Sequence, residues 1–236
     1  MNSSLTKKKD SYLKETPWDN KILNLPTFEI IIDSEKDLCL NINQLKKSKI
    51  KGHFTIKIDP LWNTKILLEN GFYYCDTLIQ PYSSSEKFIY YQCDKVNLGQ
   101  KNSLEELINI CEGAFKYDRF HRDFNVKKKK ADLRYNSWLT QLFNEDKVWG
   151  LMYEKKLAGF WAFSDNQILL HALSPDYRGK GMAKYFWSLA CQEMFKLGYQ
   201  EIISSVSASN LAVVNLYSSL GFKFKNPQDI YHLLIT

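Results

Sequence analysis

The sequence has no long apolar run: nothing in its 236 residues approaches the roughly 20 consecutive apolar residues of a membrane-spanning helix. The first segment, Met1 to Pro17, is polar and also lacks the apolar core of a secretory signal. We therefore expect no membrane insertion and a cytoplasmic location. A mean hydropathy of -0.37 and an apolar content of 44% are typical of a soluble globular chain.

The sequence also lacks closely spaced cysteines and the spread of basic and aromatic residues that is typical of nucleic-acid binding. The five cysteines are scattered, and no two have the Cys-x-x-Cys spacing of a zinc or redox site. This argues against a disulfide framework, and we expect no metal. The net charge of +6 comes largely from two short lysine runs, 7–9 and 127–130, without interleaved aromatic residues. We expect no nucleic-acid partner, and either an anionic small molecule or plain solvation accounts for the lysines.

One stretch of the chain has the features of a ligand site. Residues 168–174 are an apolar run, and a basic turn with two glycines, 175–181, follows it. The next segment, 182–197, keeps apolar residues at helical spacing and ends before Gly198, where a left-handed C-cap is expected. Backbone N–H groups in such a loop, together with a helix N-terminus, suit a pyrophosphate. A simple strand-to-helix connection is the alternative interpretation.

Hydrophobic periodicity predicts alternating helices and strands along the chain. The predicted helices span 37–45, 61–69, 104–115, 135–143, 182–197 and 210–220. The predicted strands span 28–32, 54–58, 72–80, 148–153, 157–163, 167–174 and 201–206, with two more near Phe222 and Tyr231. The three strands between 148 and 174 are joined by short turns, which predicts an antiparallel meander.

The length allows one large domain or two modest ones. The polar segment 94–102 is the clearest boundary in composition, and Ser103 with Glu106 just after it has the form of a helix capping box. The predicted parts are a flexible lead-in over 1–16, an N-terminal domain over 17–98 and a C-terminal domain over 103–236.

A short internal sequence similarity relates the two predicted domains. Residues 67–74 match residues 217–224 as a helix end, a glycine and the start of an aromatic strand. The N-terminal half has no glycine-rich loop. We therefore expect it to serve the substrate side or a structural role and to carry no chemistry of its own.

The order of elements after residue 103 resembles the GNAT acyltransferase fold. The family's Arg/Gln-x-x-Gly-x-Gly/Ala loop, which holds the pyrophosphate of coenzyme A, is similar to Arg178-Gly179-Lys180-Gly181-Met182-Ala183. The family's next helix is similar to the pattern Asn210, Leu216-Tyr217 and Gly221-Phe222, although Val213 stands where alanine is common. The implied fold class is α/β of the α+β type. It has a mixed, largely antiparallel sheet flanked by helices, preceded by a smaller degenerate GNAT-like half.

The resemblance implies how acyl-CoA would be held. Loop amides would bind the pyrophosphate, and backbone N–H groups near the end of strand 167–174 would face the thioester oxygen. Arg178 would contribute mainly through its backbone. The implied cofactor-binding residues are Ala172, Leu173, Ser174, Arg178, Gly179, Lys180, Gly181, Met182, Ala183 and Asn210. Asn210 can also cap its helix.

Two residues are candidates for proton transfer. Tyr217 is the expected proton donor to the departing thiolate, because a phenol with a pKa near 10 stays protonated at neutral pH. A core tyrosine is the alternative. His171 is the one titratable group on strand 167–174, where many GNAT relatives have a glutamate, and its reference pKa near 6.5 suits a base. A buried structural histidine, or deprotonation of the amine by water, remains open.

A second resemblance concerns the acceptor. The opening Trp18-Asp19-x-x-x-Leu23-x-x-Pro26, and Arg119-Phe120 before a Trp138-bearing helix, resemble the dTDP-amino-sugar N-acyltransferases of the dTDP-fucosamine acetyltransferase type. This implies transfer of acetyl, or a longer acyl such as 3-hydroxybutanoyl, to a dTDP-linked aminodideoxyhexose for surface-polysaccharide (lipopolysaccharide) biosynthesis. Arginine suits the sugar's pyrophosphate because its planar fork can bond two oxygens. The implied substrate-binding residues are Trp18, Arg119, Phe120, His121 and Arg122.

Two other functions fit the same residues. An acyl-CoA-dependent N-acyltransferase acting on a protein, a peptide or another small amine is the first. A peptide acceptor would favour an acidic groove, and this chain is basic. A coenzyme A-binding module without turnover is the second, and Tyr217 argues against it. A homo-oligomer is compatible with the sequence.

Overall fold

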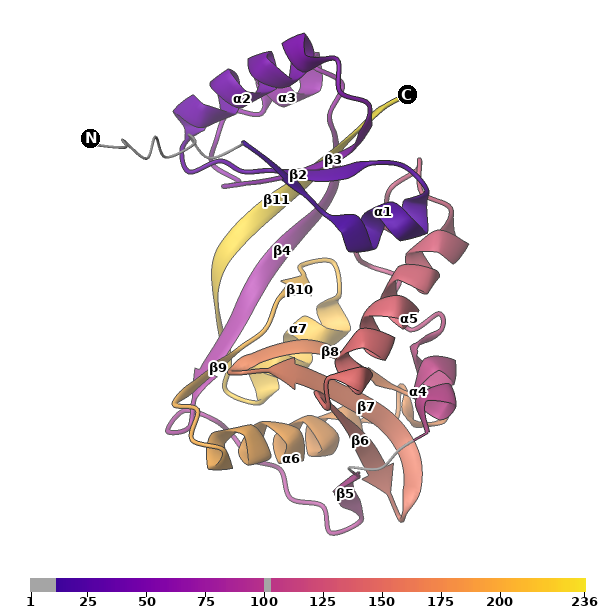
Figure 1. The fold of residues 1–236 in the computed structure, drawn as a ribbon. Helices are drawn as coiled ribbons and strands as arrows, with labels where there is room; N and C mark the ends of the chain where they lie inside the picture. The colour runs from indigo at the N-terminus through magenta and orange to yellow at the C-terminus, as the bar shows by residue number, and fades with distance from the viewer. Residues whose placement is uncertain (1–11, 100–102) are drawn as a thin grey trace, which may run out of the picture. The chain divides into compact units, whose positions relative to one another are not determined.

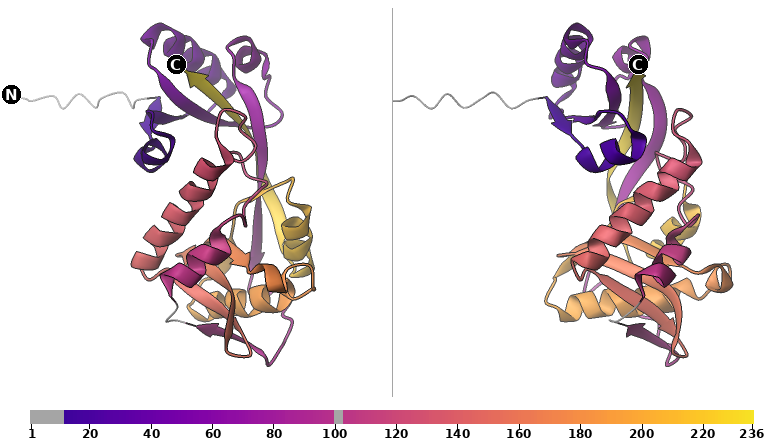
Figure 2. Two further views of the ribbon diagram at one scale, coloured as in Figure 1. Left: turned by 90° about the vertical axis from the view of Figure 1, so that its right-hand side faces the viewer. Right: turned by 45° about the vertical axis from the view of Figure 1, so that its right-hand side comes forward.

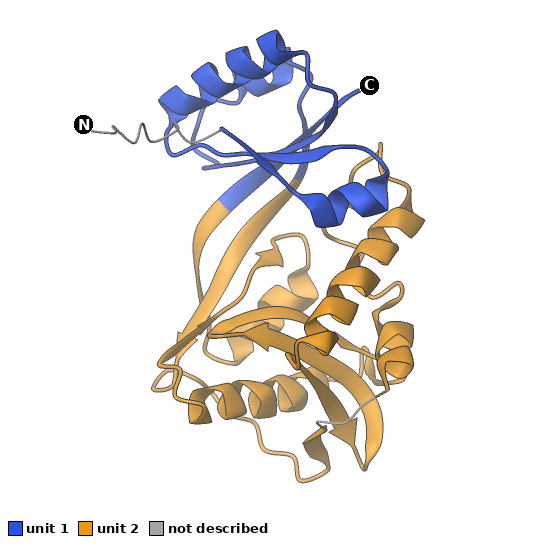
Figure 3. Ribbon diagram, viewed as in Figure 1, with its two compact units in different colours: residues 1–75, 228–236 blue, residues 76–227 orange. Residues whose placement is uncertain are grey.

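The computed structural model describes residues 12–99 and 103–236 (Figure 1). The chain divides into two compact units, Met1–Cys75 with Gln228–Thr236 (unit 1) and Asp76–Pro227 (unit 2), coloured separately in Figure 3. Each unit is described by itself. Across the described ranges, no helix combines the length and the apolar character needed to cross a membrane.

Unit 1 is a small sheet with helices packed against it (Figure 2). Its strands are β1 (Leu13–Glu15), β2 (Thr27–Ile30), β3 (Gly52–Ile58) and the last part of β11 (Lys223–Ile235), in that order. The helices are α1 (Pro17–Leu23), α2 (Glu35–Ser48) and α3 (Lys65–Glu69). Strands β2 and β3 are parallel, and the other pairs are antiparallel. The core combines one face of α2, Leu67 of α3 and alternate residues of β3, namely Phe54, Ile56 and Ile58.

Unit 2 is built on a six-stranded sheet in the order β4-β9-β8-β7-β6-β5. These strands are β4 (Tyr73–Ser84), β5 (Val96–Gly99), β6 (Val148–Tyr153), β7 (Lys156–Ser164), β8 (Gln167–Leu173) and β9 (Glu201–Ile203). The two-residue β10 (Val206–Ser207) pairs with β4. Strands β6, β7 and β8 are consecutive and antiparallel, so the predicted meander is confirmed.

Helices cover both faces of this sheet (Figure 2). They are α4 (Leu104–Cys111), α5 (Lys128–Asn144), α6 (Ala183–Lys196) and α7 (Leu211–Ser219), with a 3-10 turn at Pro175–Tyr177. Side chains of β8 are divided between two cores: Leu170 and Ala172 pack with α4 and α5, whereas Ile168, beyond a register shift in the β7–β8 pairing, and Leu173 pack with α6 and α7.

Strands β8 and β9 meet at one end and then separate. One parallel pair joins Gln167 to Ile203, and the Ser204 hydroxyl donates to the Ile168 carbonyl at 3.1 Å. Beyond this point β9 ends and β10 pairs with β4 instead. The strand predicted over 201–206 is therefore two short strands, and the last residues of β8 face a gap.

Other boundaries also differ from the sequence-based expectations. The polar segment 94–102 is not where the units divide: β5 lies within it and pairs with β6 of unit 2. Leu13–Glu15, in the predicted lead-in, form β1, while residues 1–11 lie outside the described range. Ser103 precedes α4 but makes no side-chain capping bond.

The two strands expected near Phe222 and Tyr231 are one strand, β11. The Asn226-Pro227 pair is typical of a turn. Here Asn226 takes a positive φ of 50°, and its side chain donates to the Gln80 side chain at 2.7 Å. The strand then continues, because residues 229–235 pair with β3.

Candidate active site

A cavity of about 490 Å³ lies in unit 2, between the end of β8 and β10, where β8 has separated from β9. Its wall includes Trp187 of α6 on one face of the sheet and Trp138 of α5 on the other. The wall also includes the glycine loop after β8 and residues before α7. This volume is in the range of small-molecule sites. One cavity therefore joins the glycine loop to the residues around α5.

The glycine loop has the backbone that the sequence predicts. Gly179 and Gly181 have φ angles of 70° and 69°, in the left-handed region where other residues cost about 1–2 kcal/mol. Apart from each glycine and its two neighbours in the chain, no heavy atom of the described residues lies within 4 Å of the position where a Cβ would stand on either glycine. Helix α6 begins at Ala183 without a side-chain cap or an acidic residue in its first turn. Its terminal N–H groups and its dipole therefore favour an anion.

Arg178 uses its side chain within the fold. Its Nε donates to the Leu173 carbonyl at 2.7 Å, and a terminal guanidinium nitrogen donates to the Ile110 carbonyl at 3.4 Å. The guanidinium group thereby ties the glycine loop to the end of β8. This arrangement fits a role for Arg178 through its backbone. Ser174 and Lys180 do not line the cavity, unlike the other implied cofactor-binding residues.

The backbone of β8 presents a free edge at the gap. The Ser174 N–H donates to the Ala158 carbonyl of the neighbouring strand at 2.8 Å. In an antiparallel pair, bonded and unbonded residues alternate, so the Ala172 N–H also points toward β7 and the Leu173 N–H points away from it. Leu173, rather than Ala172, therefore offers a donor at the edge of β8 that faces the gap.

His171 and Tyr217 form a hydrogen-bonded pair, with 3.0 Å between His171 Nε2 and Tyr217 Oη. His171 lines the cavity and also packs against Trp161 and Trp187, at ring-centroid distances of 5.3 and 4.7 Å. Tyr217 is fully buried and does not line the cavity. The order from the cavity inward is therefore His171 and then Tyr217.

Burial sets the charge state of this pair. It lowers the pKa of His171 to about 4, although a hydrogen bond to its own backbone acts in the opposite direction. Burial also raises the pKa of the Tyr217 phenol above its ordinary value. Both groups are therefore neutral at pH 7. A neutral imidazole with so low a pKa is a weak base, and its hydrogen bond to Tyr217 links the phenol to the cavity.

The basic segment that was expected to bind the acceptor brings one residue to the cavity. Arg119 lines the wall, whereas Phe120, His121 and Arg122 do not. Phe120 is buried, and the guanidinium carbons of Arg119 and Arg134 lie 4.8 and 4.4 Å from its ring centre. The structure therefore gives Phe120 a supporting position rather than a place against a ligand.

His121 is engaged by two carboxylates. Its Nδ1 bonds to Asp118 and its Nε2 to Asp132 at 3.2 Å. Burial by itself lowers the pKa of His121, but the hydrogen bonds and charges of these carboxylates outweigh burial, and the pKa is raised. His121 thus organises the segment before α5. Trp18 belongs to unit 1, where it is 53% exposed.

Arg122 leads to a cavity residue that the sequence analysis missed. Its NH1 donates to Asp76 Oδ1 at 3.1 Å, and Asp76 is fully buried and lines the cavity. In the sequence, the feature that pointed to Asp76 is that it is the one carboxylate in the aromatic strand predicted over 72–80. Arg134 was also missed, and Trp138 was assigned only to a helix, but both line the cavity.

Comparison with known proteins identifies the class. Residues 114–222 match the sequence profile described as the Acetyltransferase (GNAT) family. The matched segment, 109 of the 236 residues, contains the strand splay, the glycine loop and the helix that follows it, and this likeness supports an acyl-CoA-dependent N-acyltransferase. No curated protein is similar enough in sequence to count as a match.

Solved structures share the fold over most of the chain. A GCN5-related N-acetyltransferase from Sphaerobacter thermophilus aligns with a TM-score of 0.60 at 10% identity, covering 89% of this chain and 72% of that one. A GNAT-family acetyltransferase from Colwellia psychrerythraea aligns at 0.56 and 13%, covering 90% and 80%. A conserved protein of unknown function from Staphylococcus epidermidis aligns at 0.59 and 12%, covering 97% and 93%. At these identities the likeness concerns the fold alone.

Proposed function

We propose that the chain transfers an acyl group from acyl-CoA to the amino group of a dTDP-linked aminodideoxyhexose in surface-polysaccharide biosynthesis. Acetyl is the default acyl group, and a longer hydroxyacyl chain such as 3-hydroxybutanoyl is the variant to compare. The observation that carries the proposal is a cavity with two guanidinium groups beside aromatic rings, continuous with the glycine loop.

The acceptor end would use Arg119 and Arg134. Both line the cavity, and both stack on Phe120, which holds the planar guanidinium groups in place. Such groups pair with pyrophosphate oxygens two at a time. The ring centre of Trp138 lies 5.7 Å from the guanidinium carbon of Arg134. Trp138 would offer a flat face to the thymine.

The acyl-CoA end would use the backbone. Gly179, Gly181 and the start of α6 would bind the pyrophosphate, and the Leu173 N–H would polarise the thioester carbonyl. Asn210 caps α7, with its Oδ1 accepting the Val213 N–H at 3.4 Å, and it also lines the cavity beside the path of the pantetheine arm.

In the reaction, the amine nitrogen attacks the thioester carbon and the carbon–sulfur bond breaks. The amine loses one proton, and the thiolate takes one to become free coenzyme A. We assign the second transfer to the pair formed by His171 and Tyr217. His171 faces the cavity, and Tyr217 would resupply the proton through their 3.0 Å hydrogen bond.

A thiol-release assay with several acyl-CoAs tests the proposal. The acceptors are a dTDP-linked aminodideoxyhexose and the same amino sugar without the nucleotide. We expect kcat/KM to be at least about 100-fold higher for the nucleotide form, because two or more charge-assisted hydrogen bonds of about 1.5–3 kcal/mol each are made only to it.

Arg119→Ala should raise KM for the nucleotide sugar about 10- to 100-fold, the worth of one such interaction, while leaving KM for acyl-CoA unchanged. Lys129→Ala is the matched control, since Lys129 is an exposed cation outside the cavity wall. Equal turnover of the free and nucleotide-linked sugars would replace this proposal with acylation of another small amine. Coenzyme A binding without acylation of any amine would favour a non-catalytic module.

A further inference from the structure

The carboxylate of Asp76 has an uneven set of partners. Its Oδ1 accepts three hydrogen bonds, from the Thr77 N–H at 2.9 Å, the Ser207 hydroxyl at 2.7 Å and Arg122 NH1 at 3.1 Å. Its Oδ2 is buried and has no hydrogen-bond partner among residues 12–99 and 103–236. Asp76 lines the cavity between β8 and β10, the same cavity that joins the glycine loop to α5.

This arrangement is costly for a residue with a purely structural role. A buried oxygen left without a donor costs about 1–3 kcal/mol, and more when it carries charge. Arginine commonly bonds both oxygens of a carboxylate. Here Arg122 NH1 bonds Oδ1 and also the Ser209 hydroxyl, at 3.0 Å, and leaves Oδ2 open. The oxygen that lacks a donor belongs to a residue of the cavity wall, and a hydrogen-bond donor on a ligand would satisfy it.

We propose that Asp76 Oδ2 receives the ammonium group of the acceptor and takes the proton that the amine must lose before it attacks. The inference rests on the part of the proposed function that concerns the reaction, acylation of an amine, and does not depend on the acceptor being a nucleotide sugar. One ammonium proton moves to Oδ2, and the neutral nitrogen attacks the thioester carbon. The nitrogen gives up a second proton as the amide forms, which balances the proton that the thiolate takes to become free coenzyme A. The carbon–sulfur electron pair leaves with the thiolate, which is protonated separately, and Asp76 returns its proton to solvent.

The alternative base is less suited to this step. His171 Nε2 is already bonded to Tyr217, and burial weakens the imidazole as a base. For Asp76, burial is the largest influence and raises its pKa, while hydrogen bonds from Ser207 and Thr77 lower it. The charged groups that face it are Arg122, which lowers its pKa, and Asp118, which raises it. The net pKa lies above 3.8, which makes Asp76 a stronger base than an exposed carboxylate.

The wild-type pH profile gives a first test. With acyl-CoA and an ordinary amine, the ammonium form is the substrate, so kcat/KM should stay nearly level between about pH 6 and 8. Without a base, kcat/KM would follow the neutral amine and rise about 10-fold per pH unit. The panel contains the dTDP-linked aminodideoxyhexose, the free amino sugar and 2-phenylethylamine. A tenfold rise per unit for every amine that is acylated would overturn the inference.

Asp76→Asn keeps the shape of the side chain and the Oδ1 acceptor but removes the charge. We expect kcat/KM for the amine to fall about 100-fold at pH 7 and then to recover about 10-fold per pH unit. Coenzyme A affinity, measured by calorimetry, should not change and reports that the fold is intact. Asp132→Asn is the matched control, because it removes a carboxylate that bonds to His121 outside the cavity wall.

An O-alkyl hydroxylamine, which is already neutral at pH 7, separates proton transfer from structure. Asp76→Asn should acylate it within about 3-fold of the wild-type rate, because no proton has to be removed before attack. An equal loss for this acceptor and for the ordinary amine would make Asp76 structural. If Asp76→Asn does not fold, Asp76→Glu keeps the charge and should keep the level profile.

The outcomes separate the two proposals. If the nucleotide sugar is not an acceptor but another amine of the panel is, and Asp76→Asn changes its pH profile as expected, the inference stands and the nucleotide proposal fails. If the nucleotide sugar is acylated and Asp76→Asn leaves kcat/KM and the pH profile unchanged, the nucleotide proposal stands and the inference about Asp76 fails. Acylation of no amine in the panel contradicts both.

Discussion

Two helix ends in this protein have the same local structure but different surroundings. Helix α3 of unit 1 and helix α7 of unit 2 each stop at a glycine, and Gly71 and Gly221 have φ angles of 80° and 81°. In both, the N–H of the phenylalanine that follows donates to a carbonyl five residues earlier at 3.0 Å. This is the Schellman C-cap, and the matching sequence produces it in both units.

The difference lies in one buried side chain. The carbonyls that accept these bonds belong to Leu67 and Tyr217, both fully buried. Leu67 lies in an apolar core, whereas Tyr217 is bonded to His171 beside the cavity. The same C-cap therefore sets the backbone conformation at both helix ends, whereas the buried side chain, Leu67 or Tyr217, decides whether that end can take part in chemistry. That the N-terminal half is a degenerate GNAT-like domain stays a prediction.

The strands that follow the two caps also pair differently. After Gly71, β4 reaches unit 2, where its residues 78–84 pair with β9 and β10. After Gly221, β11 reaches unit 1, where residues 229–235 pair with β3. The strand after α3, β4, therefore belongs to the sheet of unit 2, and the end of the strand after α7, β11, belongs to the sheet of unit 1.

The largest expected effect sharpens the contrast between a unit with a glycine loop and one without. Gly181→Trp should abolish coenzyme A binding, a loss of at least about 100-fold by calorimetry, because a bulky residue blocks backbone approach to the pyrophosphate. Gly198→Trp is the control for backbone strain, since it has a φ of 102° and open space at the other end of α6. Unchanged affinity in folded Gly181→Trp would show that the loop does not bind the cofactor.

The second prediction concerns the tyrosine that distinguishes the two caps. Tyr217→Phe keeps the ring and removes the hydroxyl, so kcat should fall roughly 10²- to 10⁴-fold with KM nearly unchanged. The matched change in unit 1, Leu67→Met, conserves volume and should leave kcat unaffected. Full activity in Tyr217→Phe would reassign Tyr217 to the core.

The third prediction breaks the similarity of the caps. A Cβ on Gly221 would stand 2.3 Å from the Lys87 carbonyl oxygen, whereas one on Gly71 would meet only Leu233 Cδ1 at 3.6 Å. Gly221→Ala should therefore cost about 3–5 kcal/mol of stability, from strain plus overlap, and Gly71→Ala about 1–2 kcal/mol from strain alone. Hydrogen exchange resolved by peptide measures each unit. Equal losses would contradict the structure around Gly221.

The fourth prediction uses pH to distinguish the units. The folded-state pKa of His171, about 4, lies below its unfolded value near 6.5, so protons favour the unfolded state between these values. Lowering the pH from 6.5 to 4 should cost unit 2 up to about 3 kcal/mol. His171→Gln should remove this dependence. Exchange rates in β7, β8 and α6 report it, and an unchanged acid limb in His171→Gln would assign the loss to other groups.

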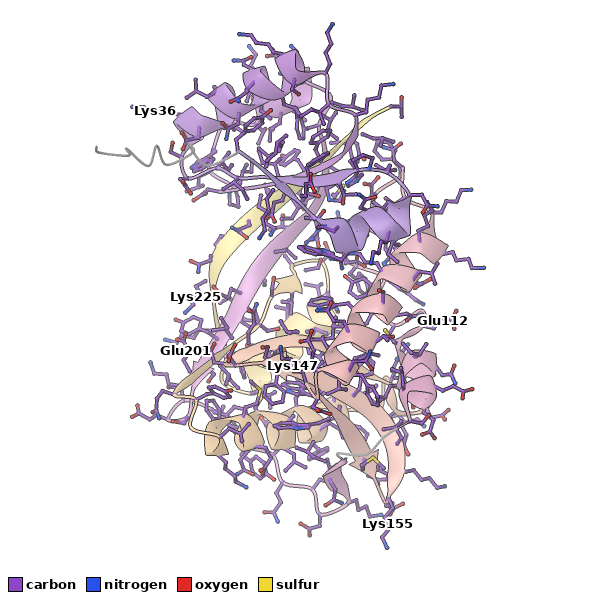
Figure 4. All side chains as sticks on the ribbon, viewed as in Figure 1. Lys36, Glu112, Lys147, Lys155, Glu201 and Lys225 are labelled. Carbon is purple, nitrogen blue, oxygen red and sulfur yellow. The ribbon has the colours of Figure 1, made fainter. Side chains whose placement is uncertain are left out.

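The smallest effects are expected from cross-strand ion pairs at the surface. In unit 2, Lys225 of β11 lies 3.1 Å from Glu201 of β9, both labelled in Figure 4. In unit 1, Lys57 lies 2.6 Å from Glu29. Glu201→Gln and Glu29→Gln should each cost no more than about 1 kcal/mol, because solvent screens both pairs, and salt should reduce the difference further. A loss above 2 kcal/mol in either, measured by urea unfolding, would show that its pair is more than a surface contact.

Local patterns predicted much of the fold and part of the site. The meander, the glycine loop and the α7 cap at Asn210 depend on neighbours in sequence, and the structure contains all three. The segment 119–122 illustrates the limit. Its basic character suggested a binding surface, but carboxylates elsewhere in the chain engage His121 and Arg122, and Arg119 alone of the four residues lines the cavity.

By itself, the sequence determined the features whose energetics are local: helix ends, left-handed glycines and the alternation of strands. Only the tertiary structure decided that Tyr217 lies behind His171 and that Asp76 enters the cavity wall. The partners of Asp76, Arg122 and Ser207, lie 46 and 131 positions away in the chain. Burial, which sets the pKa of each of these site groups, depends on such distant pairings, and no short stretch of sequence records them.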